Sequence, residues 1–543
     1  MPTHQKGSRA RVLLSSVFKP FAQDDEFGSR AINPMELYHN QVTRAQGPFS
    51  LRMFHRSWGL MFIHANITAP ATLLDFPSRE RFVHELTRGR YDIVGISAIV
   101  VNVGKVREMC RLVRRHSPGS TIVVGGHVAA IPELERTIDA DYIVRGEGVS
   151  WMRRFLADDP DRPLVHPAIP SSFRFRVMGL RSPRGGGNPA ATIIPSVGCP
   201  LGCNFCTTSA FFGGKGRFVN FYDSGEELFR VMCEVERALG TSAFFMMDEN
   251  FLLYKRRALE LLECMKRSGK AWSLYVFSSA NAIRKYEIRQ LVELGVEWIW
   301  LGLESSAAGY RKLDGADTLT LVSELQAHGI CVHGSTIIGL EHHTPVTVLD
   351  DIDRAIAHDT VFHQFMLYTP VPGTPLHAQV AAEGRLLDVD LADIHGQFKF
   401  NFRHPAISRD ESQVLLDRAF QLDFERNGPS LYRLMKIMQR RWRRYGTDAD
   451  PRVRTRVAMA ASQLRLGYGA ALWAMGKYLR RSNPSIAEQI AHLASEIEHD
   501  FGLAAKLSRR ALGPVLLWSS RLDAARHPSG RRLEPPTFVD RRH

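Results

Sequence analysis

The sequence predicts an α/β protein built from two successive α/β units and a helical C-terminal region. Three observations support this fold class. Strand-like and helix-like segments alternate over residues 11–148 and again over 191–368, a proline- and glycine-rich stretch separates the two runs, and the pattern becomes helical from about residue 410. We expect an N-terminal domain over 1–165, a linker over 166–190, a second domain over 191–405, a basic helical region over 406–520 and a disordered tail over 521–543.

The composition is that of a soluble globular protein. Among the 543 residues, 44% are hydrophobic and 23% are charged. No run of about 18 uncharged apolar residues occurs, so no membrane-spanning helix is expected. The first apolar run is very short and fits a strand better than a signal peptide. The seven cysteines favour a reducing cytoplasm over a disulfide framework.

The net charge of +14 is concentrated in the C-terminal region. From Arg426 to the end there are 23 Lys and Arg residues against 9 Asp and Glu residues, whereas the preceding residues balance. Because the positive charge lies outside the two α/β units, this distribution argues against an active site that binds a polyanion.

The first unit reads as a doubly wound parallel sheet. Its expected strands are 11–16, 59–66, 92–97, 121–124 and 142–144, and its expected helices are 79–89, 103–116 and 131–138. Such a sheet binds ligands at the carboxyl ends of its strands.

The second unit contains six strand-like runs with helical patterns between them. The strands are expected at 191–196, 241–247, 271–277, 296–303, 330–338 and 360–368, and the helices near 224–239, 255–267, 283–294, 317–328 and 344–357. In a βα barrel the active residues lie at the carboxyl ends of the strands.

Three cysteines, Cys199, Cys203 and Cys206, follow the first strand of this second unit. Three thiolates can hold three irons of a 4Fe–4S cluster and leave the fourth iron open for a small ligand. A structural zinc site would close with a fourth Cys or His at short spacing, but the next cysteine is Cys233 and no histidine lies between. The spacing therefore favours an iron–sulfur cluster.

The CxxxCxxC spacing, with aromatic Phe205 before the last cysteine and a strand before the first, resembles the radical S-adenosylmethionine (SAM) enzymes. The resemblance implies a partial (β/α)6 barrel and a catalytic cluster on the three cysteines. In that family the open iron chelates SAM, an electron from a flavodoxin- or ferredoxin-type donor cleaves it, and a 5′-deoxyadenosyl radical abstracts hydrogen from the substrate.

The same resemblance implies cofactor-binding residues at the strand ends. Asp248 and Glu249 match an acidic motif against the SAM amino group, and Glu304 matches a contact to the ribose or amino-acid part. Ile338 lies in the segment that resembles the adenine-binding backbone motif. Ser278 stands where relatives often carry an arginine. Taken singly, each acidic residue could equally be a helix cap or a buried structural partner.

Residues 80–150 resemble the cobalamin-binding domain that precedes the barrel in one radical SAM subfamily. YDIVGIS, VVGGHVA and DYIVRGEG carry this resemblance, which implies that Ser97, Gly125 and Gly126 line the cofactor loops. The DxHxxG loop that supplies a cobalt-binding histidine in many cobalamin domains is missing. Residues 18–57 occupy its place in the sequence, and although they include Asp24, Gly28 and His39, these residues do not have the DxHxxG spacing. A Rossmann-like domain that binds a dinucleotide or nothing is the alternative.

The C-terminal region combines basic and apolar helical segments, at 439–445 and 464–479. They suit either a solvated helical cap or contact with an anionic membrane or acidic partner. No nucleic-acid-binding module is recognisable, so no nucleic acid is expected.

These expectations describe a cytoplasmic enzyme, peripheral to the membrane, that uses SAM, a 4Fe–4S cluster and cobalamin to methylate an unactivated carbon of a natural-product or lipid substrate. A cobalamin-dependent oxidative cyclisation or rearrangement is the alternative within the same chemistry. A non-catalytic metal-binding module that docks on membrane or nucleic acid is the alternative of another class.

Overall fold

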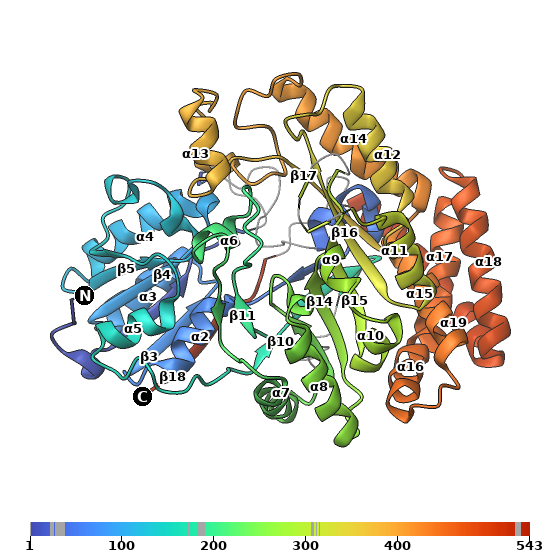
Figure 1. Ribbon diagram of the computed structural model, residues 1–543, viewed down its shortest axis with the longest axis horizontal. Helices are drawn as coiled ribbons and strands as arrows, with labels where there is room; N and C mark the ends of the chain where they lie inside the picture. The colour runs from blue at the N-terminus through green and yellow to red at the C-terminus, as the bar shows by residue number, and fades with distance from the viewer. Residues whose placement is uncertain are drawn as a thin grey trace.

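The computed structural model describes residues 2–21, 26–27, 39–171, 173–181, 190–305, 309–310, 312–313, 315–526 and 534–543. Residues 24, 25 and 28 of the 18–57 segment and residues 182–189 of the expected linker lie outside this set. An α/β layer with a six-stranded sheet, a second α/β layer with a seven-stranded sheet and a group of C-terminal helices follow one another across the molecule (Figure 1). None of the described helices is both long and apolar enough to span a membrane.

The first sheet has the strand order β18-β3-β1-β4-β5-β6, and all its strands are parallel except β18. Both faces are covered, because successive side chains point to opposite sides: Leu13 packs toward α3 and α4, whereas Val12 and Leu14 pack toward α2 and α5. The bounds are β1 Val12–Ser16, β3 Ala71–Asp75, β4 Ile93–Ser97, β5 Thr121–Gly125, β6 Tyr142–Ile143, α2 Trp58–Asn66, α3 Arg79–Gly89, α4 Val103–His116 and α5 Gly148–Phe155. The predicted doubly wound sheet is confirmed.

Two elements of this domain differ from the sequence prediction. The expected strand 59–66 is helix α2, whose apolar residues are spread around the helix, so the run carries no helical periodicity. The expected helix 131–138 is reduced to a single 3-10 turn, Leu134–Arg136, because Glu133 adopts a left-handed conformation that interrupts it.

The chain's last residues differ most clearly from expectation. Instead of a disordered tail over 521–543, helix α19 extends to Arg526 and strand β18, Phe538–Arg542, pairs antiparallel with β3. Arg541 fixes this strand, because its guanidinium donates hydrogen bonds of 2.8 Å to both carboxylate oxygens of Glu85 on α3. The two ends of the chain therefore lie in the same domain (Figure 1).

The second sheet has the order β17-β16-β15-β14-β13-β10-β7, with six parallel strands and antiparallel β7 at one edge. This confirms the predicted six βα units. The strands are β7 Ile169–Pro170, β10 Ala191–Ile193, β13 Ala243–Met246, β14 Ser273–Ser278, β15 Val296–Gly302, β16 Cys331–Ile338 and β17 Phe362–Leu367. Its helices are α7 Gly225–Leu239, α8 Lys255–Arg267, α9 Ala280–Ile283, α10 Ile288–Leu294, α11 Thr318–Ala327, α12 Thr347–Ala357 and α13 Pro375–Ala382.

The segment between β1 and α2 links the first sheet to the rest of the molecule. It contains α1 His39–Val42, the 3-10 segment Arg44–Phe49 and β2 Arg52–Phe54, which pairs with β8 Phe173–Val177 and, through it, with β9 Leu180–Arg181. The side chain of Gln46 donates a 2.9 Å hydrogen bond to Ser430 at the start of α15. This segment thus fastens the N-terminal domain to the C-terminal helices.

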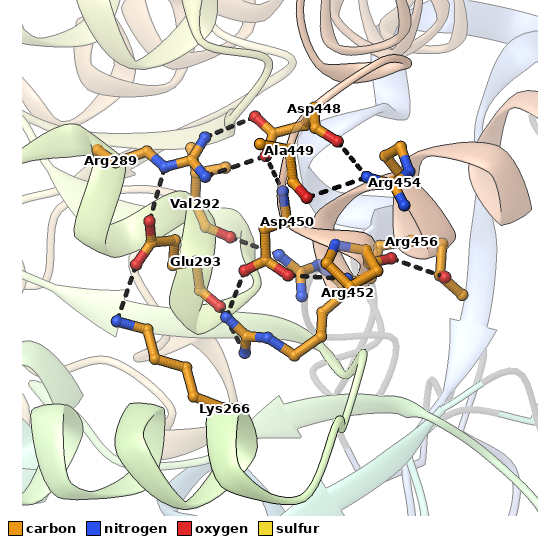
Figure 2. A network of polar contacts seen from close by, with 12 residues as sticks. Lys266, Arg289, Val292, Glu293, Asp448, Ala449, Asp450, Arg452, Arg454 and Arg456 are labelled. Atoms are coloured by element: carbon orange, nitrogen blue, oxygen red, sulfur yellow. Dashed lines mark hydrogen bonds and ion pairs between the residues drawn. The ribbon is translucent and has the colours of Figure 1, made fainter.

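The C-terminal helices are α14 Arg409–Asn427, α15 Ser430–Tyr445, α16 Pro451–Gln463, α17 Gly469–Leu479, α18 Pro484–Phe501 and α19 Leu503–Arg526, with a π-helical turn at Leu464–Tyr468. An ion-pair network joins α16 to the barrel (Figure 2). In it Arg289 of α10 donates hydrogen bonds of 2.6 and 3.0 Å to Asp448, and also contacts Glu293.

The two segments that suggested a basic surface are partly engaged within the molecule. Arg443 pairs with Glu496 and Asp500 of α18, and Arg441 pairs with Glu297 of β15. The side chains of Arg440, Arg443 and Arg444 nevertheless remain exposed. The apolar residues of α17, which lies within the expected 464–479 helix, are buried in the helical core with α15 and α18. The apolar part of a membrane contact would therefore have to come from another element.

Candidate functional site

The three cysteines lie on a loop that a short hairpin closes at its base. Strands β11 Ser196–Val197 and β12 Val219–Asn220 pair antiparallel, so residues 198–218 leave the barrel at the carboxyl end of β10 and return to the same point. Helix α6, Thr207–Phe211, begins directly after Cys206, whose sulfur accepts a 3.5 Å hydrogen bond from the Ser209 backbone. The hydroxyl of Ser209 donates to the Cys199 carbonyl at 2.7 Å.

Two backbone features shape this loop. Gly202 has a φ of 65°, and a side chain there would place its Cβ 2.6 Å from the Cα of Lys215. Only glycine fits so close an approach. The amide of Gly216 also donates a 2.8 Å hydrogen bond to the Pro200 carbonyl. The glycine-rich segment therefore folds back onto the cysteine loop and holds its shape.

The cysteine sulfurs are a donor set that fits a thiolate-binding metal cluster. All three thiols are free and partly exposed. Burial, with a smaller contribution from the nearby Cys206 and Cys203, raises the pKa of Cys199 to about 11. Burial also raises the pKa of Cys203 and Cys206. The thiolate is the form that binds a metal, so a cluster on these three sulfurs would replace their protons.

The loop is attached to the far edge of the barrel. The side-chain amide of Asn204 donates a 3.0 Å hydrogen bond to the Tyr368 hydroxyl after β17, and the backbone carbonyl of Asn204 accepts a 3.0 Å hydrogen bond from the Leu376 amide. The ring of Phe205 packs edge-on against Tyr310 at 5.3 Å. These contacts bring the ends of the first and last parallel strands together beside the cysteines.

The two acidic residues after β13 have different environments. Asp248 is buried and accepts hydrogen bonds from Arg257 at 2.5 Å and from Ser196 at 2.6 Å. Glu249 turns toward the cysteine loop, where its charge raises the pKa of Cys199 and Cys206. Its buried Oε2 has no hydrogen-bond partner among the described residues, and burial, followed by the charge of Asp248, raises its pKa to about 8. An orphaned carboxylate of this kind fits a cationic ligand group.

The serines after β14 form a polar cluster with Asn250. The hydroxyl of Ser278 donates to the Asn250 side-chain oxygen at 3.2 Å, and the Asn250 amide donates to Ser279 at 3.0 Å. The cluster is neutral and buried. Ser278 is therefore part of a hydrogen-bonded network and does not supply the charge that an arginine would.

The structure supplies a cation that the sequence analysis missed. Lys312 forms an ion pair with Glu304, and its ammonium lies 5.3 Å from the centre of the Phe205 ring. Burial alone would lower the pKa of Lys312, but Glu304 and the cysteines raise it above its usual value. The other oxygen of Glu304 is buried without a partner among the described residues. No motif in the sequence marks Lys312, because its role depends on a contact with a loop about a hundred residues earlier.

Ile338, at the end of β16, is buried in the apolar cluster with Val348 and Ile352 of α12. Its carbonyl accepts a 2.8 Å hydrogen bond from the Tyr368 amide. The side chain thus belongs to the layer between sheet and helix, and any contact that this residue makes with a ligand would be through its backbone.

Ser97, Gly125 and Gly126 lie together at the carboxyl edge of the first sheet. Gly126 has a φ of 81°, and a Cβ there would come within 2.6 Å of the Ala98 carbonyl oxygen and 2.8 Å of the Ser97 hydroxyl. Gly126 therefore lets the loops after β4 and β5 pack against each other. Gly125 has more room, because a Cβ at that position would lie 3.8 Å from its nearest neighbour, an atom of Val144.

His127 directly follows these glycines and connects them to the cysteine loop. Its ring stacks on Phe211 of α6, with ring centres 5.0 Å apart. Burial lowers its pKa to about 4, and its buried Nε2 has no hydrogen-bond partner among the described residues. No motif in the sequence marks His127, because nothing there shows which helix the loop after β5 meets.

A group of His342, His343 and Asp351 lies near the end of β16, with potential ligand atoms within 4.8 Å of one another. The Nδ1 atom of His343 accepts hydrogen bonds from the Gly339 and Leu340 amides at 3.0 and 3.2 Å. Its Nε2 therefore carries the proton and donates to Asp351 at 2.8 Å. This arrangement leaves Nε2 no lone pair for a metal. The group instead stabilises the structure, because His343 connects the loop after β16 to Asp351 of α12.

Comparison with protein-family models identifies both domains. A "B12 binding domain" matches residues 59–156, and a "Radical SAM superfamily" domain matches residues 193–355. The chain carries a B12-binding domain and a radical SAM domain. Together these domains imply cobalamin, a 4Fe–4S cluster and SAM as cofactors, as expected from the sequence.

Several relatives match over most of this chain. The bacteriochlorophyllide d C-8(2)-methyltransferase of Chlorobaculum tepidum is 24% identical over 72% of this chain and 87% of its own length. The hopanoid C-2 methylase of Rhodopseudomonas palustris is 25% identical over 61% of this chain and 63% of its own length. The solved radical SAM methyltransferase TsrM of Kitasatospora setae covers 77% of this chain and 90% of its own, with 17% identity and a TM-score of 0.51, which shows a shared fold. These relatives support enzyme activity over a purely structural metal-binding module.

Proposed function

We propose that this protein is a cobalamin-dependent radical SAM methyltransferase that transfers a methyl group to an unactivated carbon of a natural-product or lipid substrate. The observation that carries the proposal is the junction of its two cofactor domains. His127 of the B12-binding domain lies against Phe211 of α6, and α6 begins at Cys206 of the cluster loop. Methyl transfer from cobalamin to a substrate radical requires the two cofactors to face one substrate.

We assign the chain's own groups to the cofactors as follows. The thiols of Cys199, Cys203 and Cys206 hold the cluster. The orphaned carboxylate of Glu249 pairs with the ammonium group of SAM, a charge-assisted contact in a largely dry site.

Lys312 takes the place that an arginine after β14 would otherwise fill, and pairs with the SAM carboxylate. Glu304 orients the lysine through their ion pair and leaves its second oxygen for the ribose or amino-acid part. Ser97, Gly125 and Gly126 form the edge that receives cobalamin, and the backbone of Ile338 borders the adenine.

The proposal is tested on the full chain, purified and reconstituted without oxygen and supplied with a reduced flavodoxin or ferredoxin. The protein is expected to convert SAM into both 5′-deoxyadenosine and S-adenosylhomocysteine. A variant with Ala at Cys199, Cys203 and Cys206 should lose its iron and form no 5′-deoxyadenosine. Deoxyadenosine from this variant would overturn the cluster assignment.

Methyl-labelled SAM distinguishes methylation from cyclisation or rearrangement. A methyltransferase passes the label to its product, whereas a cyclase forms deoxyadenosine without S-adenosylhomocysteine and leaves the product unlabelled. Formation of deoxyadenosine alone, with any substrate that the enzyme turns over, would contradict the methyl-transfer half of the proposal.

We also propose that the protein works in the reducing cytoplasm and contacts the membrane from that side. All seven cysteines are free thiols, which suits such a compartment. The excess of positive charge after Arg426 suits an anionic lipid surface. Because the apolar residues of α17 are buried in the helical core, the apolar part of the contact has to come from another element.

A further inference from the structure

Helix α19 is apolar on two opposite faces. Its inner face, which includes Ala505, Gly513 and Ser520, is buried, and Gly513 lies close enough to the Trp473 ring of α17 that a Cβ would approach it to 2.8 Å. With about 100° between successive residues, Leu503, Leu507, Val515 and Trp518 project from the opposite side. A helix that only covered the core would carry polar residues there.

The outer apolar residues are far from buried. Leu503 is 72% exposed, Leu507 55%, Val515 54% and Trp518 65%. They extend over most of the length of a 24-residue helix. Isolated exposed apolar side chains are ordinary, but a continuous stripe on one helix face indicates a binding surface.

The charges that border this stripe have one sign. Lys506, Arg510, Arg521 and Arg526 are exposed on α19, and the fifth basic residue, Arg509, pairs with Glu498 of α18 at 2.7 Å. The helix contains a single acidic residue, Asp523, and it is half-buried. A second copy of the chain would bring like charges together, whereas an anionic lipid surface would neutralise them.

We infer that the outer face of α19, defined by Leu503, Leu507, Arg510, Val515, Trp518 and Arg521, docks on an anionic membrane surface. The leucines, valine and tryptophan enter the boundary between headgroups and acyl chains, and the basic residues contact lipid phosphates. Together with α17 and α18, α19 lies at the end of the molecule away from the first sheet (Figure 1). Docking there leaves the B12-binding domain free of the lipid surface. This inference does not depend on methyl transfer.

The test is flotation of the full-length protein with vesicles of phosphatidylcholine alone or with about one-third phosphatidylglycerol. Wild-type protein is expected to float with the anionic vesicles at low salt and to be released as salt rises. Two variants separate the contributions to binding: Leu507→Gln with Trp518→Gln removes apolar contacts, and Arg510→Glu with Arg521→Glu reverses charge. Each should lower the partition coefficient by about tenfold or more.

Val414→Gln is the matched control, because Val414 is 67% exposed on α14, outside the proposed face. It should float as the wild type does. Circular dichroism and iron content establish that every variant is folded. Absence of wild-type binding, or unchanged binding of both α19 variants, would overturn the inference. A wild-type dimer that the Leu507 and Trp518 substitutions convert to a monomer would identify a self-association surface instead.

Discussion

Asp248 and Arg257 form a buried ion pair, with an oxygen–nitrogen distance of 2.5 Å. Because of this pair, Asp248 and Glu249, two adjacent carboxylates that look equivalent in the sequence, have different environments. Asp248 is bound within the protein's own structure, whereas its neighbour Glu249 has a buried oxygen beside the cysteine loop that no described residue contacts by a hydrogen bond. Substitutions at the two positions should therefore have different consequences.

Glu249→Gln is expected to weaken SAM binding by about 10- to 100-fold, because a charge-assisted contact is replaced by a neutral one. Its iron content and melting temperature should stay close to those of the wild type. Asp248→Asn is the matched variant: it leaves the Arg257 guanidinium buried without its counter-ion and should cost about 3–5 kcal/mol of stability. Isothermal titration with SAM and thermal unfolding distinguish the two. Equal effects of both substitutions on SAM affinity would contradict the assignment.

Lys312→Met should raise the dissociation constant of SAM by tenfold or more, since the ligand carboxylate loses its cation. Lys312→Arg retains the charge and should restore part of the affinity. Because Lys312→Met also leaves Glu304 buried and unpaired, the double variant Lys312→Met with Glu304→Gln serves as the stability control. Normal SAM affinity in a folded double variant would show that this ion pair does not bind SAM.

His127→Phe is expected to lower the amount of cobalamin that the protein retains, with no change in its iron content. Phenylalanine preserves the stacking on Phe211 but removes Nε2, a buried nitrogen that has no hydrogen-bond partner in the part of the chain that the structure describes and that could therefore bond to a ligand. Cobalamin is measured by absorbance after gel filtration, and iron by colorimetric assay. Equal cobalamin in variant and wild type would show that Nε2 has no role in holding the cofactor.

Arg541→Met should destabilise the B12-binding domain by about 1–3 kcal/mol at neutral pH. The hydrogen bonds from Arg541 are the main cause that lowers the pKa of Glu85 in the folded state. A lowered folded-state pKa means that the pair stabilises the protein above the usual glutamate pKa and loses this effect as pH falls through the folded-state value. The difference in melting temperature between variant and wild type should therefore shrink toward pH 4. Asp540→Asn, at an exposed position on the same strand, is the control. A difference that persisted in acid would assign the stabilisation to packing.

The sequence predicted regular, local features well and long-range ones poorly. Hydrophobic runs marked the parallel strands of the barrel, and β10, β13, β14, β15, β16 and β17 lie within or close to the ranges that the sequence predicted. Residues 59–66 are apolar on every side, so periodicity could not separate a strand from helix α2. Strand β18 depends on pairing with β3, more than four hundred residues earlier, and its Arg-rich composition resembles that of a disordered tail.

In the candidate site, too, local features could be predicted from the sequence and long-range ones could not. The cysteine motif predicts a chemistry from its spacing alone, so the sequence by itself proposes Cys199, Cys203 and Cys206 as cluster ligands. The difference between Asp248 and Glu249 depends on the position of Arg257, nine residues on, and the importance of Lys312 and His127 depends on loops from elsewhere in the chain. Tertiary neighbours, not local pattern, decide which polar groups remain available to a ligand.

Strand β18 also has a consequence for biosynthesis. A ribosome that has made all five parallel strands of the first sheet still has the barrel and the C-terminal helices to produce before β18 emerges. Until then the outer edge of β3 exposes unpaired amide and carbonyl groups, and Glu85 lacks its arginine. The first domain to leave the exit tunnel is thus among the last to be completed, and a nascent chain stalled near its end would present an open edge to chaperones.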